Sequence, residues 1–175
     1  MRRIAALLVL GLILTAAPAR AGMIDGNDTP GKLDIDDAHT FRDGIGQGDA
    51  VRVRIQMLAG FGSRLLDESG PNRFFLYFDT TNDGSSDLRG TISTVNGVIE
   101  MTIVGGGETY GPLTARHPLA TELNVTLPEA QPYNPNRAWN LWIASRFTND
   151  RRCSTPCVDR YPNDGSIRVP AGDDS

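Results

Sequence analysis

Apolar and polar residues alternate along much of the chain with the two-residue period of a β-strand. Residues 51–57 show this most plainly, because Val51, Val53, Ile55 and Met57 alternate with two arginines and a glutamine. Successive side chains of a strand point to opposite faces, so the pattern predicts a strand with one buried face. Similar stretches bring the predicted strands to about eight: 33–41, 51–57, 72–79, 86–95, 97–104, 121–127, 138–147 and 166–169.

Four stretches carry more local information. Residues 72–79 are apolar almost throughout, which predicts a central strand buried on both faces. Asn96-Gly97 predicts a two-residue hairpin, because both residues tolerate positive φ. Residues 57–72 are expected to hold one short helical turn, and the glycine- and proline-rich stretch 105–118 is expected to be a loop.

These elements predict an all-β fold. No long stretch keeps a helical period, and 19 glycines and 11 prolines interrupt the chain often. Many short strands separated by turn signals are typical of a β-sandwich. We therefore expect a single antiparallel β-sandwich or jelly-roll-like domain over residues 22–170, followed by a frayed tail at 171–175.

The first 21 residues have the pattern of a cleaved signal peptide. Arg2 and Arg3 precede an apolar stretch from Ile4 to Thr15, and an A-x-A cleavage motif ends at Ala21. The apolar stretch is shorter than the roughly 20 residues that span a bilayer. We therefore predict a secreted, extracellular protein without a transmembrane anchor in its mature chain.

Removal of the signal peptide changes the net charge. The chain has 17 Lys+Arg and 21 Asp+Glu, and three arginines leave with the signal, so 14 basic residues remain against 21 acidic ones, a net charge of −7. A surface of this sign repels nucleic acid and attracts divalent cations. Nucleic acid is therefore not an expected partner.

The stretch 78–87, FDTTNDGSSD, has oxygen-bearing side chains at every second position. Calcium binds several hard oxygen ligands on a curled loop, and the candidates are Asp79, Thr81, Asp83, Ser85 and Asp87. An EF-hand is not expected, because Gly90 occupies the position of the bidentate glutamate and the flanking stretches are strand-like. The alternative is an ordinary turn, with the acids at either end capping it.

A calcium shell at this loop would need another acid from elsewhere in the chain. The candidates for distal ligands are Asp28, Asp34, Asp37 and Asp159. Whether Ca²⁺ or a plain turn describes the loop stays open at this point.

Cys153 and Cys157 are the only cysteines. In an exported chain an even pair predicts a disulfide, and closing so small a loop contributes about 2 kcal/mol. A zinc site would need two more ligands, and both histidines lie far away in the sequence. A redox-active pair is the remaining alternative.

Catalytic motifs are scarce, whereas a binding role has candidate residues. The chain has no G-x-S-x-G, H-E-x-x-H or P-loop motif. Trp142 is out of step with the buried positions of its predicted strand, so beside Arg146 it is a candidate for stacking on a sugar. A second buried face is the alternative for Trp142. Glu100 is the one strand-centred glutamate available for a glycosidase, which needs two carboxylates.

Three stretches together resemble a known group of proteins. GNDTPGKLDI (26–35), FFLYFDTTNDGSSDLRG (74–90) and CSTPCVDRYPNDG (153–165) are similar to uncharacterised secreted β-rich proteins of GC-rich Gram-positive bacteria. The resemblance covers nearly the whole mature chain and implies an exported β-domain without an established activity. It carries over six acids: Asp28, Asp34, Asp79, Asp83, Asp87 and Asp159. Thr81-Asn82 departs from the more acidic loop that the resemblance leads one to expect.

The sequence as a whole predicts a non-catalytic extracellular β-sandwich, with calcium as its possible cofactor. Its expected role is binding or interaction, with an extracellular glycan or another protein as the partner. The alternative is a small jelly-roll hydrolase that acts on glycans. An exposed aromatic or a loop-mounted ion favours binding, whereas two carboxylates converging on a concave face favour hydrolysis.

Overall fold

The computed structural model describes residues 31–42, 50–127, 137–148 and 156–171. These residues form ten strands and one short 3-10 helix, η1 (Ser63–Leu66). Among them no helix is long and apolar enough to cross a bilayer. The strands are β1 (Ile35–Arg42), β2 (Val51–Met57), β3 (Arg73–Asp79), β4 (Leu88–Val95), β5 (Val98–Gly105), β6 (Glu108–Leu119), β7 (Glu122–Leu127), β8 (Trp139–Phe147), β9 (Cys157–Tyr161) and β10 (Ile167–Val169).

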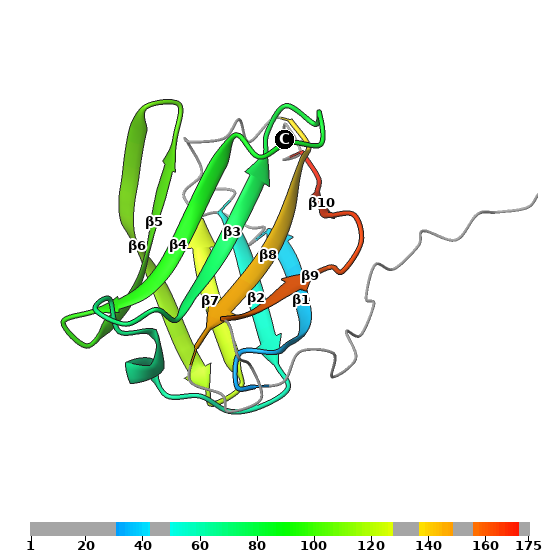
Figure 1. The fold of residues 1–175 in the computed structure, drawn as a ribbon. Helices are drawn as coiled ribbons and strands as arrows, with labels where there is room; N and C mark the ends of the chain where they lie inside the picture. Colours follow the sequence, from blue (N-terminus) through cyan, green and yellow to red (C-terminus); the bar gives the residue numbers. More distant parts are fainter. Residues whose placement is uncertain (1–30, 43–49, 128–136, 149–155, 172–175) are drawn as a thin grey trace, which may run out of the picture.

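The strands form two layers that share β6 (Figure 1). The first, here the β2 layer, contains β1, β2, β7 and the second half of β6. The second, here the β3 layer, contains the first half of β6, then β5, β4, β3 and β8. Both β9 and β10 pair with the free edge of β8, at different positions along it. All these pairings are antiparallel, so the predicted all-β antiparallel sandwich is confirmed.

The core lies between the two layers and follows the alternation of the sequence. Val53 and Ile55 of β2 face inward, as do Leu76 and Phe78 of β3, and all four are fully buried. Trp139 of β8 packs against Phe78 with a ring-centroid distance of 5.6 Å. Each large apolar side chain buried in this way contributes about 1.5–3 kcal/mol.

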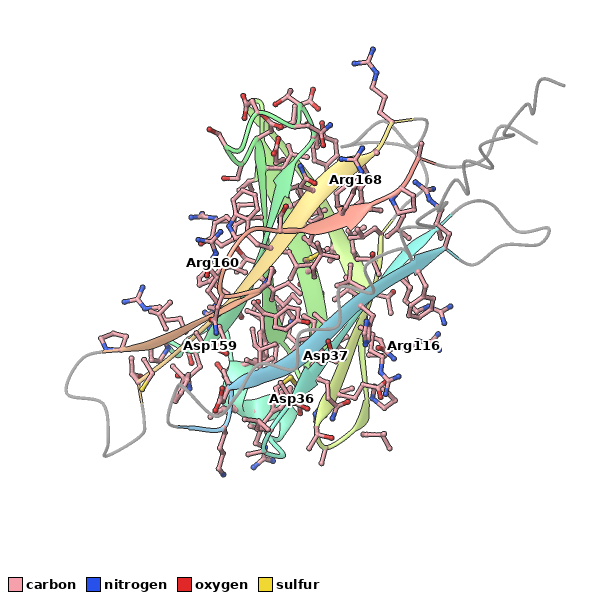
Figure 2. The ribbon with its side chains drawn as sticks, turned by 90° about the vertical axis from the view of Figure 1, so that its right-hand side faces the viewer. Asp36, Asp37, Arg116, Asp159, Arg160 and Arg168 are labelled. Carbon is pink, nitrogen blue, oxygen red and sulfur yellow. The ribbon has the colours of Figure 1, made fainter. Side chains whose placement is uncertain are left out.

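The side of the sandwich opposite the shared strand β6 is closed by side chains. There β1 faces β9 and β10 without a backbone ladder between them in the described part of the chain. Figure 2 looks onto this seam, with Asp37 on one side of it and Asp159 on the other. Side-chain hydrogen bonds join its two sides: Ile35 N–H donates to Asp159 Oδ2 (2.6 Å), Ser145 Oγ to the Leu33 carbonyl (2.5 Å), the Tyr161 hydroxyl to Asp37 Oδ1 (2.8 Å) and Arg42 Nη2 to the Pro170 carbonyl (2.8 Å).

Several local predictions are confirmed. The predicted strand at 51–57 coincides with β2. Asn96 and Gly97 connect β4 to β5 with φ values of 51° and 84°, as a two-residue hairpin turn requires. The expected helical turn is η1.

Other local predictions are wrong. The expected loop at 105–118 is mostly strand β6, because Gly106 and Gly107 make a tight turn and Pro112 lies beside an irregularity in the pairing of β5 and β6. Strand β3 is buried on one face only, since Phe75 and Tyr77 are half-buried on the outer face. Strand β9 was not predicted.

Some predicted features lie outside the described residues. They are the signal peptide, the end of the tail, Asp28 and Cys153. Cys157 is buried at the start of β9. The disulfide therefore stays a prediction.

Candidate functional site

The acidic stretch forms the connection between β3 and β4 at one end of the β3 layer. Asp79 is the last residue of β3 and is buried, whereas residues 81–87 are exposed. The Asp87 N–H donates to the Phe78 carbonyl (2.8 Å), which closes the base of the loop. Asn82 and Gly84 have φ values of 60° and 88°, so the chain reverses through left-handed residues that asparagine and glycine tolerate well.

Asp79 organises the first half of this loop. Its carboxylate accepts hydrogen bonds from the N–H groups of Asp83 (3.1 Å) and Gly84 (3.0 Å). The side-chain amide of Asn140, on β8, donates to the same carboxylate (3.3 Å). Burial raises the pKa of Asp79, but the hydrogen bonds outweigh this effect, and the pKa lies below its ordinary value. Asp79 is therefore ionised at neutral pH.

Asp87 organises the start of the loop. Its Oδ2 accepts from the hydroxyl and the N–H of Thr80, both at 2.7 Å, and from the N–H of Thr81 at 3.1 Å. Burial again raises the pKa, and the hydrogen bonds from Thr80 and Thr81 again outweigh it, so the pKa of Asp87 is lowered. The two acids at the ends of the loop both cap backbone N–H groups.

This geometry supports the alternative of a capped turn. The Ser85 N–H donates to Asp83 Oδ1 at 2.8 Å. Three of the five candidate ligands, Asp79, Asp83 and Asp87, therefore use carboxylate oxygens to accept hydrogen bonds from backbone N–H groups of the loop itself. Within the described ranges no group of three His, Cys, Asp or Glu side chains is arranged to hold a metal. A calcium site at this loop stays an untested alternative to the capped turn.

Three of the proposed distal ligands, Asp34, Asp37 and Asp159, lie at the seam, away from the loop. On β8 the residue paired with Asp79 is Asn140, and the residue paired with Asp159 is Ser145. Five residues of strand correspond to about 17 Å. Asp34 and Asp159 are both buried, and Asp37 accepts the Tyr161 hydroxyl at the same seam. Their positions fit a role in closing the sandwich.

Trp142 lies on the outer face of the β3 layer, half-buried. Its ring stacks on Tyr77 of the neighbouring strand β3, with centroids 5.7 Å apart and planes 12° from parallel. Arg160 comes from β9, the neighbour of β8 on its other side, and its guanidinium lies 5.6 Å from the Trp142 ring centre. Arg160 thus covers the ring by a cation–π contact.

A hollow of about 480 Å³ brings Trp142 and the acidic loop together. Sequence reasoning treated these two features separately, and the pairing of β3 with β8 makes them neighbours. Arg146 does not line this hollow and instead pairs across the strands with Arg73. The side chains that line it are Asp79, Asn82, Asp83, Asn140, Trp142, Arg160 and Ser166, of which Asp79 is buried.

Asn82, Asn140 and Arg160 were not predicted as site residues. Asn140 carries a weak sequence signal, because it alternates outward between the buried Trp139 and Leu141. Its amide donates to Asn82 Oδ1 at 3.0 Å, and Asn82 Nδ2 donates to the Ala138 carbonyl at 2.8 Å. These bonds tie the loop to β8 and fix the floor of the hollow.

The chain matches no protein-family model, no curated protein and no solved structure. The chemistry of the hollow therefore has to be read from its own residues.

Proposed function

We propose that the protein is a non-catalytic, exported β-sandwich that binds a carbohydrate in the hollow at Trp142. One observation carries the proposal: a half-buried tryptophan lines the same hollow as amide, carboxylate and guanidinium groups. A sugar ring has an apolar C–H face and a rim of hydroxyl groups. Aromatic rings pack against the face, and planar polar side chains hydrogen-bond the rim.

Each group has a specific task in this proposal. Arg160 is exposed and lies over the ring, so the sugar displaces it, and its guanidinium then donates to sugar hydroxyls. Asp83 uses one oxygen on Ser85 and has no bond from the described residues on the other, which is available to accept from a hydroxyl. Tyr77 supports the opposite side of Trp142 and holds the ring in place.

Binding is favoured over glycan hydrolysis by the state of the carboxylates. A glycosidase needs a carboxylic acid that keeps its proton and a second carboxylate across the scissile bond. Asp79 has a lowered pKa and is engaged by three donors, so it has no proton to give. Asp83 belongs to the same short loop and not to a facing strand. Glu100 faces Ser93 and Thr114 on other strands of the layer.

The test is binding of the purified protein to a panel of soluble polysaccharides, by affinity electrophoresis followed by calorimetry. Trp142→Ala is expected to weaken binding about tenfold, because an aromatic contact of this kind is worth about 1.5 kcal/mol. The matched control is Tyr110→Ala, which removes another partly buried aromatic from β6 and lines neither this hollow nor the hollow of about 440 Å³ on the other layer. Unchanged binding by Trp142→Ala, or an equal loss in the control, would sink the proposal.

Export is tested separately. The secreted protein is expected to begin at Gly22 when its amino terminus is sequenced. Retention of residues 1–21 in the mature protein would contradict the extracellular location.

A further inference from the structure

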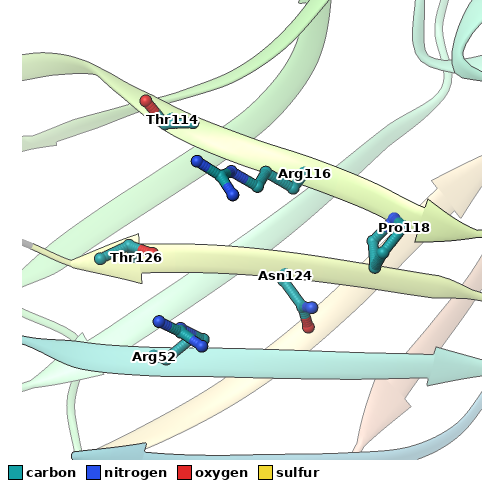
Figure 3. Close-up of a pocket in the computed structure, with 6 residues that line it drawn as sticks. All are labelled: Arg52, Thr114, Arg116, Pro118, Asn124 and Thr126. Atoms are coloured by element: carbon teal, nitrogen blue, oxygen red, sulfur yellow. The ribbon is translucent and has the colours of Figure 1, made fainter. Parts of the chain in front are cut away.

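The outer face of the β2 layer contains a second hollow, of about 440 Å³ (Figure 3). It is formed by three neighbouring strands, β2, β7 and β6. Arg52 on β2 lies opposite Thr126 on β7, and Arg116 on β6 lies opposite Asn124 on β7. Figure 3 shows the two arginines on either side of β7. Neighbouring strands are about 4.8 Å apart, so the two arginine backbones are separated by about 10 Å across β7.

The lining of this hollow is positively charged. Its residues are Arg52, Thr114, Arg116, Pro118, Asn124 and Thr126, and none of these described residues is acidic. The nearby carboxylate of Glu122 is already paired with Arg54 at 2.8 Å. Arg52 lies over the ring of Phe41, 5.4 Å from its centre, which supports the arginine from the edge of the sheet. Arg52 and Arg116 thus contribute two guanidinium groups to the lining of one hollow.

The floor between the arginines carries neutral polar groups. Asn124 Nδ2 donates to Glu122 Oε1 at 2.8 Å, and because a carboxylate only accepts, this bond fixes which way the amide points. The amide oxygen is buried and receives no hydrogen bond from the described residues. The hydroxyls of Thr114 and Thr126 line the same hollow. A small shift of Asn124 would offer this oxygen to a ligand hydroxyl as an acceptor.

We infer that this second hollow binds the carboxylate of a sugar acid, with its hydroxyls directed at Thr114, Asn124 and Thr126. Guanidinium groups pair with carboxylates through two parallel hydrogen bonds, which gives both energy and orientation. The threonines and the amide supply partners for hydroxyls that a bare anion lacks. A long polyanion such as nucleic acid fits less well, since the mature chain is expected to carry a net charge of −7. The described residues of the lining also offer no aromatic ring on which a base could stack.

The test titrates the purified protein with D-galacturonate and with D-galactose, which differ at the carboxylate. Chemical-shift changes in a two-dimensional NMR spectrum and calorimetry report the binding. Galacturonate is expected to bind at least tenfold more tightly than galactose. A short oligogalacturonide, compared with the monomer, shows whether the acid is recognised within a chain. Equal binding of galactose would overturn the inference, and so would equally tight binding of inorganic sulfate, which would reduce the site to a general anion site.

Two variants locate the site. Arg52→Gln and Arg116→Gln are each expected to weaken galacturonate binding about tenfold or more. Arg116 is exposed and has no ion pair with the described residues, so its variant keeps the test valid even if Arg52→Gln unfolds. The charge-matched control is Arg89→Gln, on the outer face of β4 in the opposite layer. Equal losses in all three variants would assign the effect to net charge and overturn the site. The Trp142→Ala variant is expected to bind galacturonate normally, which separates this inference from the proposed function.

Discussion

The two outer faces of the sandwich carry hollows of similar size and opposite character. The hollow on the β3 layer is lined by two acids, two asparagines, a tryptophan and one arginine. The described residues that line the hollow on the β2 layer include two arginines but no acid or aromatic ring. The inward side chains of both layers are equally apolar. The core thus fixes every second residue of each strand and leaves the others free to build different surfaces on the same framework.

The hollows also differ in how they are built. The floor of the Trp142 hollow is a loop whose backbone is held by the buried Asp79. The floor of the Arg52–Arg116 hollow is made of side chains on regular strands, with Asn124 at its centre. Removing a floor residue of the first hollow should therefore destabilise the protein, whereas removing a floor residue of the second should change its stability little.

The largest expected effect is that of Asp79→Ala. The substitution leaves two N–H groups and the Asn140 amide without their acceptor, and it is expected to lower the free energy of unfolding by roughly 3 kcal/mol. Asn124→Ala, the matched change in the other hollow, should cost about 1 kcal/mol, because Glu122 keeps its pair with Arg54. Urea denaturation measures the free energy of unfolding of both variants. Equal decreases would show that the floors of the two hollows contribute equally to stability and would contradict the contrast.

An intermediate effect is expected from acid. The pKa values of Asp79 and Asp87 are lower in the folded protein than the ordinary value of 3.8. The two ionised carboxylates therefore stabilise the fold at pH values above 3.8. This stabilisation is lost as the pH falls through their folded-state pKa values. The urea concentration at the unfolding midpoint should decrease as the pH falls below about 5. In Asp79→Asn this decrease should be smaller. The described residues that line the arginine hollow include no acid and no histidine. The affinity for galacturonate should therefore be constant between pH 5 and 8. A change in affinity within this range that arises from a group on the protein would contradict the contrast between the two hollows.

The smallest expected effect is that of calcium. Because Asp79, Asp83 and Asp87 already hold the loop backbone, we expect no resolvable difference in melting temperature between calcium and chelator. An ion in hundredfold excess over its dissociation constant would add about 2.7 kcal/mol, which thermal unfolding detects easily. A clear rise in melting temperature with calcium that Asp83→Ala abolishes would establish a calcium site in the loop. The first hollow would then contain a metal ion.

Much of the fold was predictable because alternation and turn chemistry are local. The alternation at 51–57 and the Asn96-Gly97 pair correctly predicted β2 and the β4–β5 hairpin. Strand β6 was missed because its glycines and prolines hid a strand that changes layers. The aromatic rings of Phe75 and Tyr77 predict a second core face for β3. In the structure both are only half-buried on the outer face, where they pack beside Arg89 and Trp142.

The sites were predictable only in part, since they depend on which strands become neighbours. The acidic loop and Trp142 were both singled out, but their meeting in one hollow follows from the pairing of β3 with β8. Arg160 and Arg116 lie on β9 and β6, the two strands that sequence patterns did not predict. Asp34 and Asp159 were assigned to a metal shell because no local pattern reveals that they lie at the seam.

The seam between β1 and β9 also determines the order in which the molecule is completed. The bond from Ile35 to Asp159 joins residues 124 positions apart, and that from Arg42 to Pro170 joins residues 128 apart. Closing such long loops is entropically costly, so we expect these contacts to form after the hairpins of the β3 layer. Contacts that form after the transition state govern the unfolding rate more than the folding rate. We therefore expect the side-chain seam to control how slowly the folded sandwich unfolds.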